Sequence, residues 1–374
     1  MAIEKIHIKQ FLELANHHRV IDVRSPGEYK HAHIPGAYSL PLFTDEERAA
    51  VGTAYKQESR EKAIKLGLDF FGPKMKRMVE EVEELMGNRQ QAITNNSDKN
   101  LPIANCLLLY CWRGGMRSAA LAWLLDLYGY KVYTLEGGYK AFRNWVFHQF
   151  DKPYNFKVLG GYTGSGKTIL IKELKCLGHP VVDLEDLANH KGSAFGEMEN
   201  PQPRQEMFEN LIAINLFQQE TKLQQQKEQE EFGKDFFSPA IWIEDESQRI
   251  GALNIPKGFW DQMRSSPLYF IDIPFEERLN HLLSNYSNLK RVDTINAITR
   301  IQKRLGGLET KNAINFIMQN NTREAFSILL KYYDKYYKKG LQSRENLSLL
   351  LNKIPCNTVS LSNVNKLFFS QNSC

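Results

Sequence analysis

The sequence predicts an α/β protein of two domains, each built around a parallel β-sheet. The chain has 374 residues, and a domain of this class has about 150, so two domains are expected. Short apolar stretches with strand character alternate with helical patterns through residues 1–275, which is typical of parallel strands joined by crossover helices. In both halves a glycine-rich turn stands directly between a strand and a helix.

The first domain is expected over residues 1–148. Buried strands that end in turns are predicted at Arg19–Ser25, Cys106–Cys111 and Lys131–Gly138. Helical patterns are found at Asp45–Ala50, Met75–Leu85 and Arg117–Leu127. The polar stretch Gly87–Asn100 predicts a loop.

The second domain is expected to have its core over residues 149–275. A strand at Phe156–Gly161 leads through a glycine-rich turn into a helix at Lys167–Leu177. Further strands are predicted in "PVVDLED", "AIWIEDES" and "PLYFIDIP". The polar run Gln218–Glu231 is expected to continue a long helix, and residues 276–374 are expected to form a mostly helical part that packs on this domain.

Composition excludes several classes. No apolar run reaches the roughly 18 residues of a membrane span, and the amphipathic start lacks the apolar centre of a signal peptide, so a cytoplasmic protein is expected. A net charge of +5 permits a nucleic-acid partner without requiring one. The cysteines are odd in number and never spaced CxxC, which argues against a disulfide framework or a structural zinc site: Cys106, Cys111, Cys176, Cys356 and Cys374.

The turn "YCWRGGMRS" places a cysteine between a strand and a helix, close to two arginines. A free thiol with a pKa of ~8.5 is only about 3% ionised at pH 7. Arg113 and Arg117 supply positive charge, and the turn and the helix start supply backbone N–H groups, so Cys111 is predicted to be a reachable thiolate. The alternative is a buried structural cysteine. The residues that complete this anion-binding loop are Gly114, Gly115, Met116 and Ser118.

The second turn, "GGYTGSGKT", is a full Walker A pattern between a strand and a helix. Its glycines let backbone N–H groups surround a diphosphate, its lysine neutralises charge, and its threonine can reach a magnesium ion. The pattern indicates a diphosphate but does not identify a nucleotide. The expected diphosphate-binding residues are Gly161, Thr163, Gly164, Ser165, Gly166, Lys167 and Thr168.

Two other stretches are expected near this loop. Glu244 and Asp245 follow an apolar strand, where a P-loop protein holds its magnesium ion, although acidic residues are also common in solvated turns. The stretch "HKGSAFG" predicts a substrate-contacting loop, with Ser193 and Gly196 as the contacts; a merely flexible turn is the alternative.

Three stretches of the first domain resemble a rhodanese domain: Val20–Leu42, the cysteine turn and Gly129–Phe142. In that family the loop cysteine carries sulfur as a persulfide. The spacing Cys111-x5-Arg117 departs from the sulfurtransferases, whose loop is usually one residue shorter, and matches the related phosphatases. A phosphatase is therefore an alternative, although Tyr110 stands where phosphatases generally have histidine.

Together, five stretches in order resemble the tRNA 2-selenouridine synthase family: "VGTAYKQESREKAIKLGL", "YCWRGGMRS", "GGYTGSGKT", "HKGSAFG" and "IEDESQRIG". The resemblance implies a two-step change to the wobble 2-thiouridine of tRNA, first S-geranylation with geranyl diphosphate and then selenium transfer from selenophosphate. The P-loop would hold the leaving diphosphate, and the loop of Cys111, Arg113 and Arg117 would receive selenophosphate. No tightly bound cofactor is expected, and Mg²⁺ is left open.

A tRNA substrate needs basic residues for its phosphates and aromatic residues for unpaired bases. Lysines and tyrosines alternate in "LLKYYDKYYKKG", and further positive charge lies in "RIQKRLGG" and "KQESREKAIK". Taken alone, each stretch is better explained by an amphipathic helix with solvated lysines and packed tyrosines. The tRNA-binding residues predicted with the resemblance are Lys56, Arg60, Arg300, Lys303, Arg304, Lys331, Lys335, Lys338 and Lys339.

Two other classes of function stay open at this point. One is a sulfurtransferase or phosphatase coupled to ATP hydrolysis, in which the P-loop supplies energy. The other is a non-catalytic nucleotide-sensing scaffold. A requirement for ATP would distinguish the ATP-coupled enzyme from an enzyme that uses a diphosphate as leaving group. Activity that does not change when Cys111 or Lys167 is replaced would indicate the scaffold.

Overall fold

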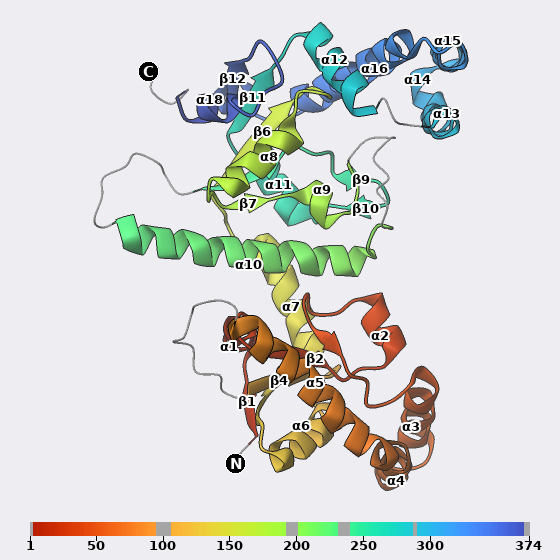
Figure 1. The fold of residues 1–374 in the computed structure, drawn as a ribbon, viewed down its shortest axis with the longest axis vertical. Helices are drawn as coiled ribbons and strands as arrows, with labels where there is room; N and C mark the ends of the chain where they lie inside the picture. Colours follow the sequence, from red (N-terminus) through yellow and green to blue (C-terminus); the bar gives the residue numbers. More distant parts are fainter. Residues whose placement is uncertain (1–2, 95–105, 192–200, 231–239, 287–289, 370–374) are drawn as a thin grey trace. The chain divides into compact units, whose positions relative to one another are not determined.

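A computed structural model describes residues 3–94, 106–191, 201–230, 240–286 and 290–369 (Figure 1). The chain divides into two compact units, Met1–His148 and Gln149–Cys374. Ser193 and Gly196, the expected contacts of the "HKGSAFG" loop, lie outside the described residues. No helix among the residues that the structure describes is long and apolar enough to cross a membrane.

The first unit is built on a five-stranded sheet in the order β1-β5-β4-β2-β3, and every pair is parallel. The central strand β4 is buried along its whole length, as its continuous apolar sequence predicts. The strands are β1 Glu4–Ile6, β2 Arg19–Asp22, β3 Tyr38–Ser39, β4 Cys106–Tyr110 and β5 Lys131–Leu135.

Helices surround this sheet and pack apolar side chains against it (Figure 1). Local sequence explains where several of them start: in α3, for example, Thr44 accepts a hydrogen bond from Glu47 N–H and Glu47 bonds back to Thr44. The helices are α1 Ile8–Ala15, α2 Pro26–His31, α3 Asp45–Gln57, α4 Arg60–Phe71, α5 Met75–Thr94, α6 Met116–Tyr128 and α7 Gly138–Asp151, with a 3₁₀ turn at Gly72–Lys74.

The second unit contains a five-stranded parallel sheet in the order β12-β11-β6-β8-β7. The glycine-rich turn follows β6, the middle strand, so it lies at the centre of the carboxyl edge, where parallel sheets bind ligands. The strands are β6 Phe156–Gly161, β7 Val181–Val182, β8 Ile241–Glu244, β11 Leu268–Asp272 and β12 Leu351–Pro355, and a separate antiparallel pair is formed by β9 Arg249–Ile250 and β10 Leu253–Asn254.

The helices of this unit form two groups. Those before residue 275 belong with the sheet: α8 Lys167–Cys176, α9 Leu184–Leu187, α10 Gln205–Glu230 and α11 Lys257–Ser265. The later ones pack around a separate apolar core: α12 Phe275–Tyr286, α13 Arg291–Arg300, α14 Gln302–Leu305, α15 Gly307–Met318 and α16 Thr322–Gln342. The chain then returns to the sheet with α17 Leu347–Leu350, β12 and α18 Asn363–Phe369.

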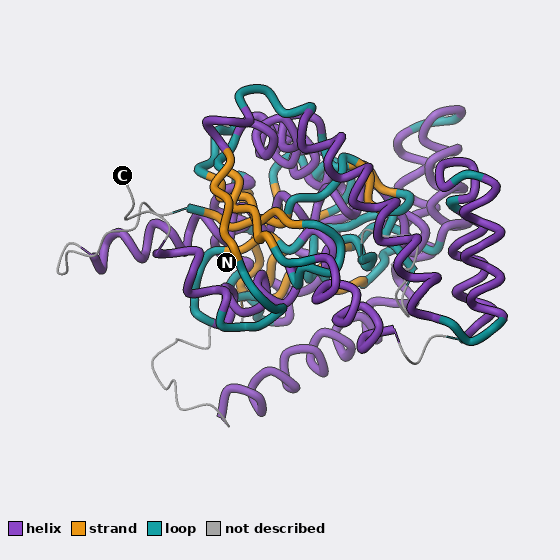
Figure 2. The backbone as a smooth tube through the Cα atoms, turned by 90° about the horizontal axis from the view of Figure 1, so that it is seen from above, coloured by secondary structure: helices purple, strands orange, loops and turns teal. Residues whose placement is uncertain are grey.

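The predicted α/β class is confirmed, and Figure 2 shows a mostly helical backbone with strands confined to a few places. Two local predictions differ from the structure. The stretch expected as a loop from Gly87 continues helix α5 as far as Thr94, because charged and amide residues are good helix formers. Strand β12, which the sequence did not indicate, completes the second sheet by pairing with β11.

Candidate active site

The cysteine loop joins β4 to α6, and backbone N–H groups at the start of α7 bond to its carbonyl oxygens. Cys111 directly follows β4, and its carbonyl oxygen accepts a hydrogen bond from Tyr139 N–H at 2.8 Å. A Cβ at Gly138 would collide with that carbonyl oxygen, and Gly114 has a φ of +63°, so both positions favour glycine. The glycines therefore allow two backbone segments to approach closely enough to fix the loop.

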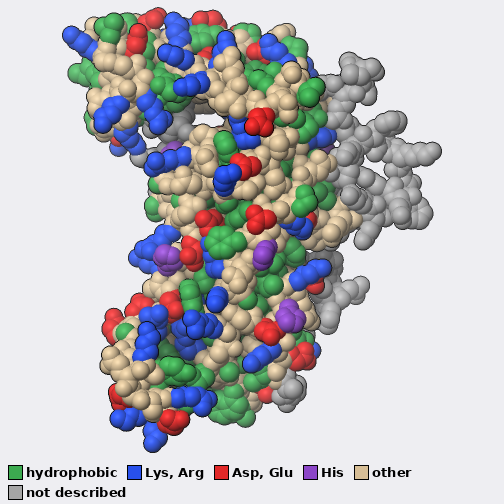
Figure 3. All heavy atoms as spheres, turned by 180° about the vertical axis from the view of Figure 1, so that it is seen from behind, with side chains coloured by type: hydrophobic (Ala, Val, Ile, Leu, Met, Phe, Trp, Pro, Cys, Tyr) green, Lys and Arg blue, Asp and Glu red, His purple; other side chains and the backbone are tan. Residues whose placement is uncertain are grey.

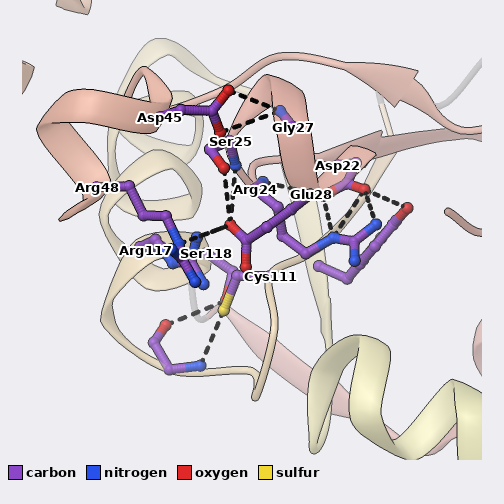
Figure 4. A network of polar contacts seen from close by, with 12 residues as sticks. Asp22, Arg24, Ser25, Gly27, Glu28, Asp45, Arg48, Cys111, Arg117 and Ser118 are labelled. Atoms are coloured by element: carbon purple, nitrogen blue, oxygen red, sulfur yellow. Dashed lines mark hydrogen bonds and ion pairs between the residues drawn. The ribbon is translucent and has the colours of Figure 1, made fainter. Parts of the chain in front are cut away.

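The sulfur of Cys111 lies among polar groups of its own loop (Figure 4). It accepts hydrogen bonds from the Gly115 N–H and the Ser118 hydroxyl, both at 3.2 Å. Only 3% of the residue is exposed, so the expectation of a freely reachable thiol is corrected: Cys111 directly follows a buried strand, and its sulfur is bonded within its own loop. The thiol is nonetheless held by two hydrogen-bond donors of its own loop.

The two arginines of the loop differ. Arg117 donates from Nη1 to Glu28 Oε2 at 2.8 Å, and Arg48 lies 3.4 Å from the same oxygen, so both guanidinium groups meet at one carboxylate near Cys111 (Figure 4). Arg113 is exposed and makes none of these contacts. The structure thus brings Cys111, Gly115, Arg117 and Ser118 together, whereas Arg113 and Met116 are exposed.

Glu28 titrates below its ordinary range. Burial raises the pKa of this carboxyl, but the hydrogen bond and charge of Arg117 outweigh it and leave the pKa lower than its usual 4.5. A carboxyl whose pKa is lower in the folded than in the unfolded protein stabilises the fold at pH values above the unfolded pKa. This stabilisation is lost as the pH falls through the folded pKa.

We expect Glu28→Gln to lower the free energy of unfolding by about 1–3 kcal/mol at pH 7, as for a hydrogen bond to a charged partner.

This difference should shrink when urea denaturation is repeated at pH 4, because the carboxyl of the unfolded chain keeps its ordinary pKa and takes up a proton that the folded carboxyl resists. Glu58→Gln is the control, since Glu58 pairs with Lys62 on the exposed surface and should change stability little. An equal loss from Glu28→Gln at both pH values would show that its charge is not the cause.

A buried charged network under the loop was not recognised in the sequence. Arg24 bonds to Asp22 through Nη2 at 2.7 Å and lies 3.8 Å from the centre of the Tyr139 ring. Tyr110 donates its hydroxyl proton to Asp22 at 2.7 Å, which explains why a tyrosine occupies the position before Cys111. The signal was available, because "VIDVRS" contains two charges within an otherwise buried strand. These contacts fix the segments on which the loop rests.

The P-loop has the geometry that its pattern predicts. It connects β6 to α8, and Gly161, Gly164 and Gly166 all have positive φ, which a side chain would strain. Lys167 Nζ donates to Gly161 O at 3.3 Å and lies 3.7 Å from Glu244 Oε1. Burial lowers the pKa of Lys167, but Glu244 and other nearby carboxylates raise it above its usual value, so the lysine is charged.

Three carboxylates gather beside Lys167 and Thr168. One oxygen each of Glu185, Glu244 and Glu246 lies within 4.8 Å of the others, and Thr168 donates its hydroxyl proton to Glu185 at 3.0 Å. Burial and mutual repulsion raise the pKa of all three, for Glu246 to about 8. Such a cluster is relieved by a divalent cation, and oxygen donors suit Mg²⁺.

Two buried polar atoms at this place have no hydrogen-bond partner among the described residues: Glu244 Oε2 and Ser165 Oγ. Because buried polar atoms are usually paired, they indicate that this place binds a polar ligand or an ion. The donor set fits a magnesium ion held by Thr168 and the three glutamates. Glu185 and Glu246 were not identified from the sequence, although both follow strands of the second sheet.

Asp245 does not belong to this cluster. Its carboxylate is paired with the buried Arg344 and accepts a hydrogen bond from Tyr337 at 2.6 Å. The expectation that it contacts magnesium is therefore corrected: successive residues after a strand point in different directions, and Asp245 points towards the C-terminal helices.

The basic residues expected to bind tRNA all lie on exposed parts of the chain. Helix α16 presents Lys331, Lys335, Lys338 and Lys339 to solvent, and Figure 3 shows Lys and Arg side chains gathered over the helices of this region. Arg300, Lys303 and Arg304 are exposed on α13 and α14, and Lys56 and Arg60 on α3 and α4. Tyr337, one of the tyrosines offered for base stacking, instead bonds to the P-loop strand.

Comparison with known proteins agrees with this architecture. Residues 7–144 match the family model of the rhodanese-like domain, and residues 154–354 match the tRNA 2-selenouridine synthase AAA domain. A protein of Sulfurovum sp. (strain NBC37-1) named tRNA 2-selenouridine synthase is 35% identical to this chain, and the match covers 90% of this chain and 92% of that one. The protein of the same name from Nitrosomonas europaea is also 35% identical, and the match covers 82% of this chain and 72% of that one. The one from Bdellovibrio bacteriovorus is 32% identical, over 87% and 89%.

The fold and its two loops therefore define a rhodanese-like domain joined to a P-loop domain of the AAA type. The extent of the match, across both domains and most of the length of the relatives, goes further than a shared fold. The chain belongs to the tRNA 2-selenouridine synthase family.

Proposed function

We propose that this protein is an enzyme that converts the wobble 2-thiouridine of tRNA into 2-selenouridine, in the cytoplasm, by S-geranylation followed by selenium transfer. Family membership supports the overall reaction. The observation that carries the two-step form is the presence of two separate anion-binding loops, one around Cys111 and one around Lys167, each at the carboxyl end of a central parallel strand.

The P-loop is proposed to hold geranyl diphosphate. The sulfur of 2-thiouridine attacks the first carbon of the geranyl group, the carbon–oxygen bond breaks, diphosphate leaves, and the base loses its N3 proton. Charge grows on the leaving diphosphate, so Lys167 and the backbone N–H groups of the loop stabilise the transition state more than the ground state. A Mg²⁺ ion held by Thr168 and the glutamate cluster would neutralise further charge on this leaving group.

The cysteine loop is proposed to receive selenophosphate. Selenium forms a bond to C2 of the base, the carbon–sulfur bond breaks, and geranylthiol leaves; water then cleaves the selenium–phosphorus bond and releases phosphate. Arg117 and Arg48 meet at Glu28 beside the loop, so the site has one more positive than negative charge for this anion. The hydrogen bonds from the Gly115 N–H and the Ser118 hydroxyl would hold the Cys111 sulfur in place beside the selenophosphate during selenium transfer.

The experiment that tests this proposal separates the two steps. The protein is incubated without nucleotide with a tRNA that contains 2-thiouridine and with geranyl diphosphate, and selenophosphate is then added, with nucleoside mass spectrometry after each addition. Geranylthiouridine should appear first and selenouridine second. Failure to geranylate, or a requirement for ATP, would contradict the proposed role of the P-loop and favour an ATP-coupled sulfurtransferase.

The lysine face of α16, which we define as Lys331, Lys335, Lys338 and Lys339, is proposed to contact tRNA phosphates. Reversing the charge in Lys335→Glu/Lys339→Glu should weaken tRNA binding about tenfold at moderate salt and flatten its salt dependence, because fewer counterions are released. Titration of labelled tRNA at several salt concentrations measures both effects. The control Lys76→Glu/Lys257→Glu makes the same charge change at two exposed lysines of other helices; an equal loss there would contradict a specific contact.

A further inference from the structure

Arg278, on helix α12, is a buried arginine that bonds directly to the P-loop backbone. Only 3% of the residue is exposed, and its Nη1 donates to the carbonyl oxygen of Thr163 at 3.0 Å. The same guanidinium forms two hydrogen bonds to Asp334 of α16, at 2.8 and 2.7 Å, and Nε donates to Ile273 O at 3.1 Å. Four of the five N–H donors of this side chain are thus bonded: one to the P-loop, two to Asp334 of α16 and one to the carbonyl that follows β11.

The bond to Thr163 has a consequence for the next N–H group of the loop. In a planar trans peptide the C=O and N–H point in opposite directions. Because Arg278 holds the carbonyl of Thr163, the N–H of Gly164 must point away from Arg278, and this N–H is one of those available to bind an anion in a P-loop. Gly164 also packs closely against α12, since a Cβ there would lie 2.9 Å from the Arg278 carbonyl oxygen.

Helix α16 supports this arrangement with two residues on one face. Asp334 holds the guanidinium of Arg278, and Tyr337, three residues later, accepts a hydrogen bond from the Gly161 N–H at 3.1 Å. The beginning of the P-loop is therefore attached to α16 directly at Gly161 and through Arg278 at Thr163. The lysine face of the same helix is exposed, so one helix serves both the loop and the surface proposed for tRNA.

We propose that Arg278 is a positioning residue for diphosphate binding: held by Asp334, it sets the Thr163–Gly164 peptide so that the Gly164 N–H faces the anion. The inference rests on the proposed diphosphate role of the P-loop. Arg278 itself does not need to touch the substrate. Its effect is to keep one donor of the loop aimed before the anion arrives, which lowers the cost of binding.

The test compares two arginines that join the same pair of helices. Arg278→Lys keeps the charge but cannot bond to Asp334 and Thr163 in the same fork. Arg323→Lys is the matched control, because Arg323 of α16 pairs with Glu276 and Asn280 of α12 without touching the P-loop. Calorimetric titration of the whole protein with pyrophosphate and Mg²⁺ gives the affinity, and thermal unfolding gives the stability of each variant.

We expect Arg278→Lys to raise the Kd for pyrophosphate about tenfold, the loss of one well-aligned charge-assisted hydrogen bond, while Arg323→Lys leaves it unchanged. An unchanged Kd in Arg278→Lys would overturn the inference even if the variant is less stable. If that variant does not fold, Asp334→Asn, which loosens the guanidinium but keeps the bond to Thr163, should still raise the Kd about threefold; no rise would count against the proposal. Absence of pyrophosphate binding in the wild type would instead refute the proposed function.

Discussion

Replacing Cys111 by alanine is expected to abolish the formation of selenouridine while leaving geranylation of tRNA intact. The sulfur is held by the Gly115 N–H and the Ser118 hydroxyl within a loop flanked by Arg117, and the geranylation step is proposed for the other loop, around Lys167. Loss of a polar group that is preorganised beside a reacting anion typically costs about 10² to 10³-fold in rate, so we expect selenation to fall by at least about 100-fold.

The measurement supplies each step with its own substrate. Purified geranylated tRNA and selenophosphate report the second step, and thiolated tRNA with geranyl diphosphate reports the first. Cys111→Ser is informative beside alanine, because a hydroxyl keeps the polar contacts of the loop but is a far weaker nucleophile. Cys176→Ala, at an exposed cysteine, is the control and should be active in both steps. Geranylation lost with Cys111, or selenation that survives without it, would refute this division of labour.

Replacing Lys167 by alanine is expected to have the opposite effect, with geranylation lost and selenation of pre-geranylated tRNA retained. Lys167 is buried, and the neighbouring carboxylates hold its pKa above the ordinary value, so it carries a fixed positive charge at the place proposed for the diphosphate. Removing one such preorganised charge should slow geranylation by about 10² to 10³-fold. The change also leaves Glu244 buried without its cation, which adds repulsion to the glutamate cluster.

Single-turnover geranylation measures the first step, and the second step uses the same pre-geranylated tRNA as for Cys111. Lys172→Ala is the matched control, since Lys172 is exposed on the same helix α8. Thermal unfolding shows whether a loss in Lys167→Ala comes from misfolding; in that case Lys167→Met, which keeps the length of the side chain, separates charge from packing. Geranylation that continues in both folded variants would remove the P-loop lysine from the mechanism.

The class of fold and the positions of both loops could be predicted from sequence, because each depends on neighbours along the chain. A strand, a glycine-rich turn and a helix that follow one another within about 20 residues form their hydrogen bonds locally, and the spacing of glycine, lysine and threonine directly sets which groups face an anion. Strand β4 with Cys111 and strand β6 with Gly161 both follow this rule.

Only the tertiary structure decided which distant residues complete the sites. Glu28 reaches Arg117 from helix α2. Glu185 reaches Thr168 from helix α9, and Glu246 joins the cluster from the turn after β8. Asp245 turns away to Arg344. For Cys111 the sequence likewise predicted the neighbouring loop residues, but it did not predict that the side chain is buried. Contacts between segments far apart in the sequence depend on how each sheet packs with its own helices. The spacing of residues in the sequence does not give the direction in which a side chain leaves a turn.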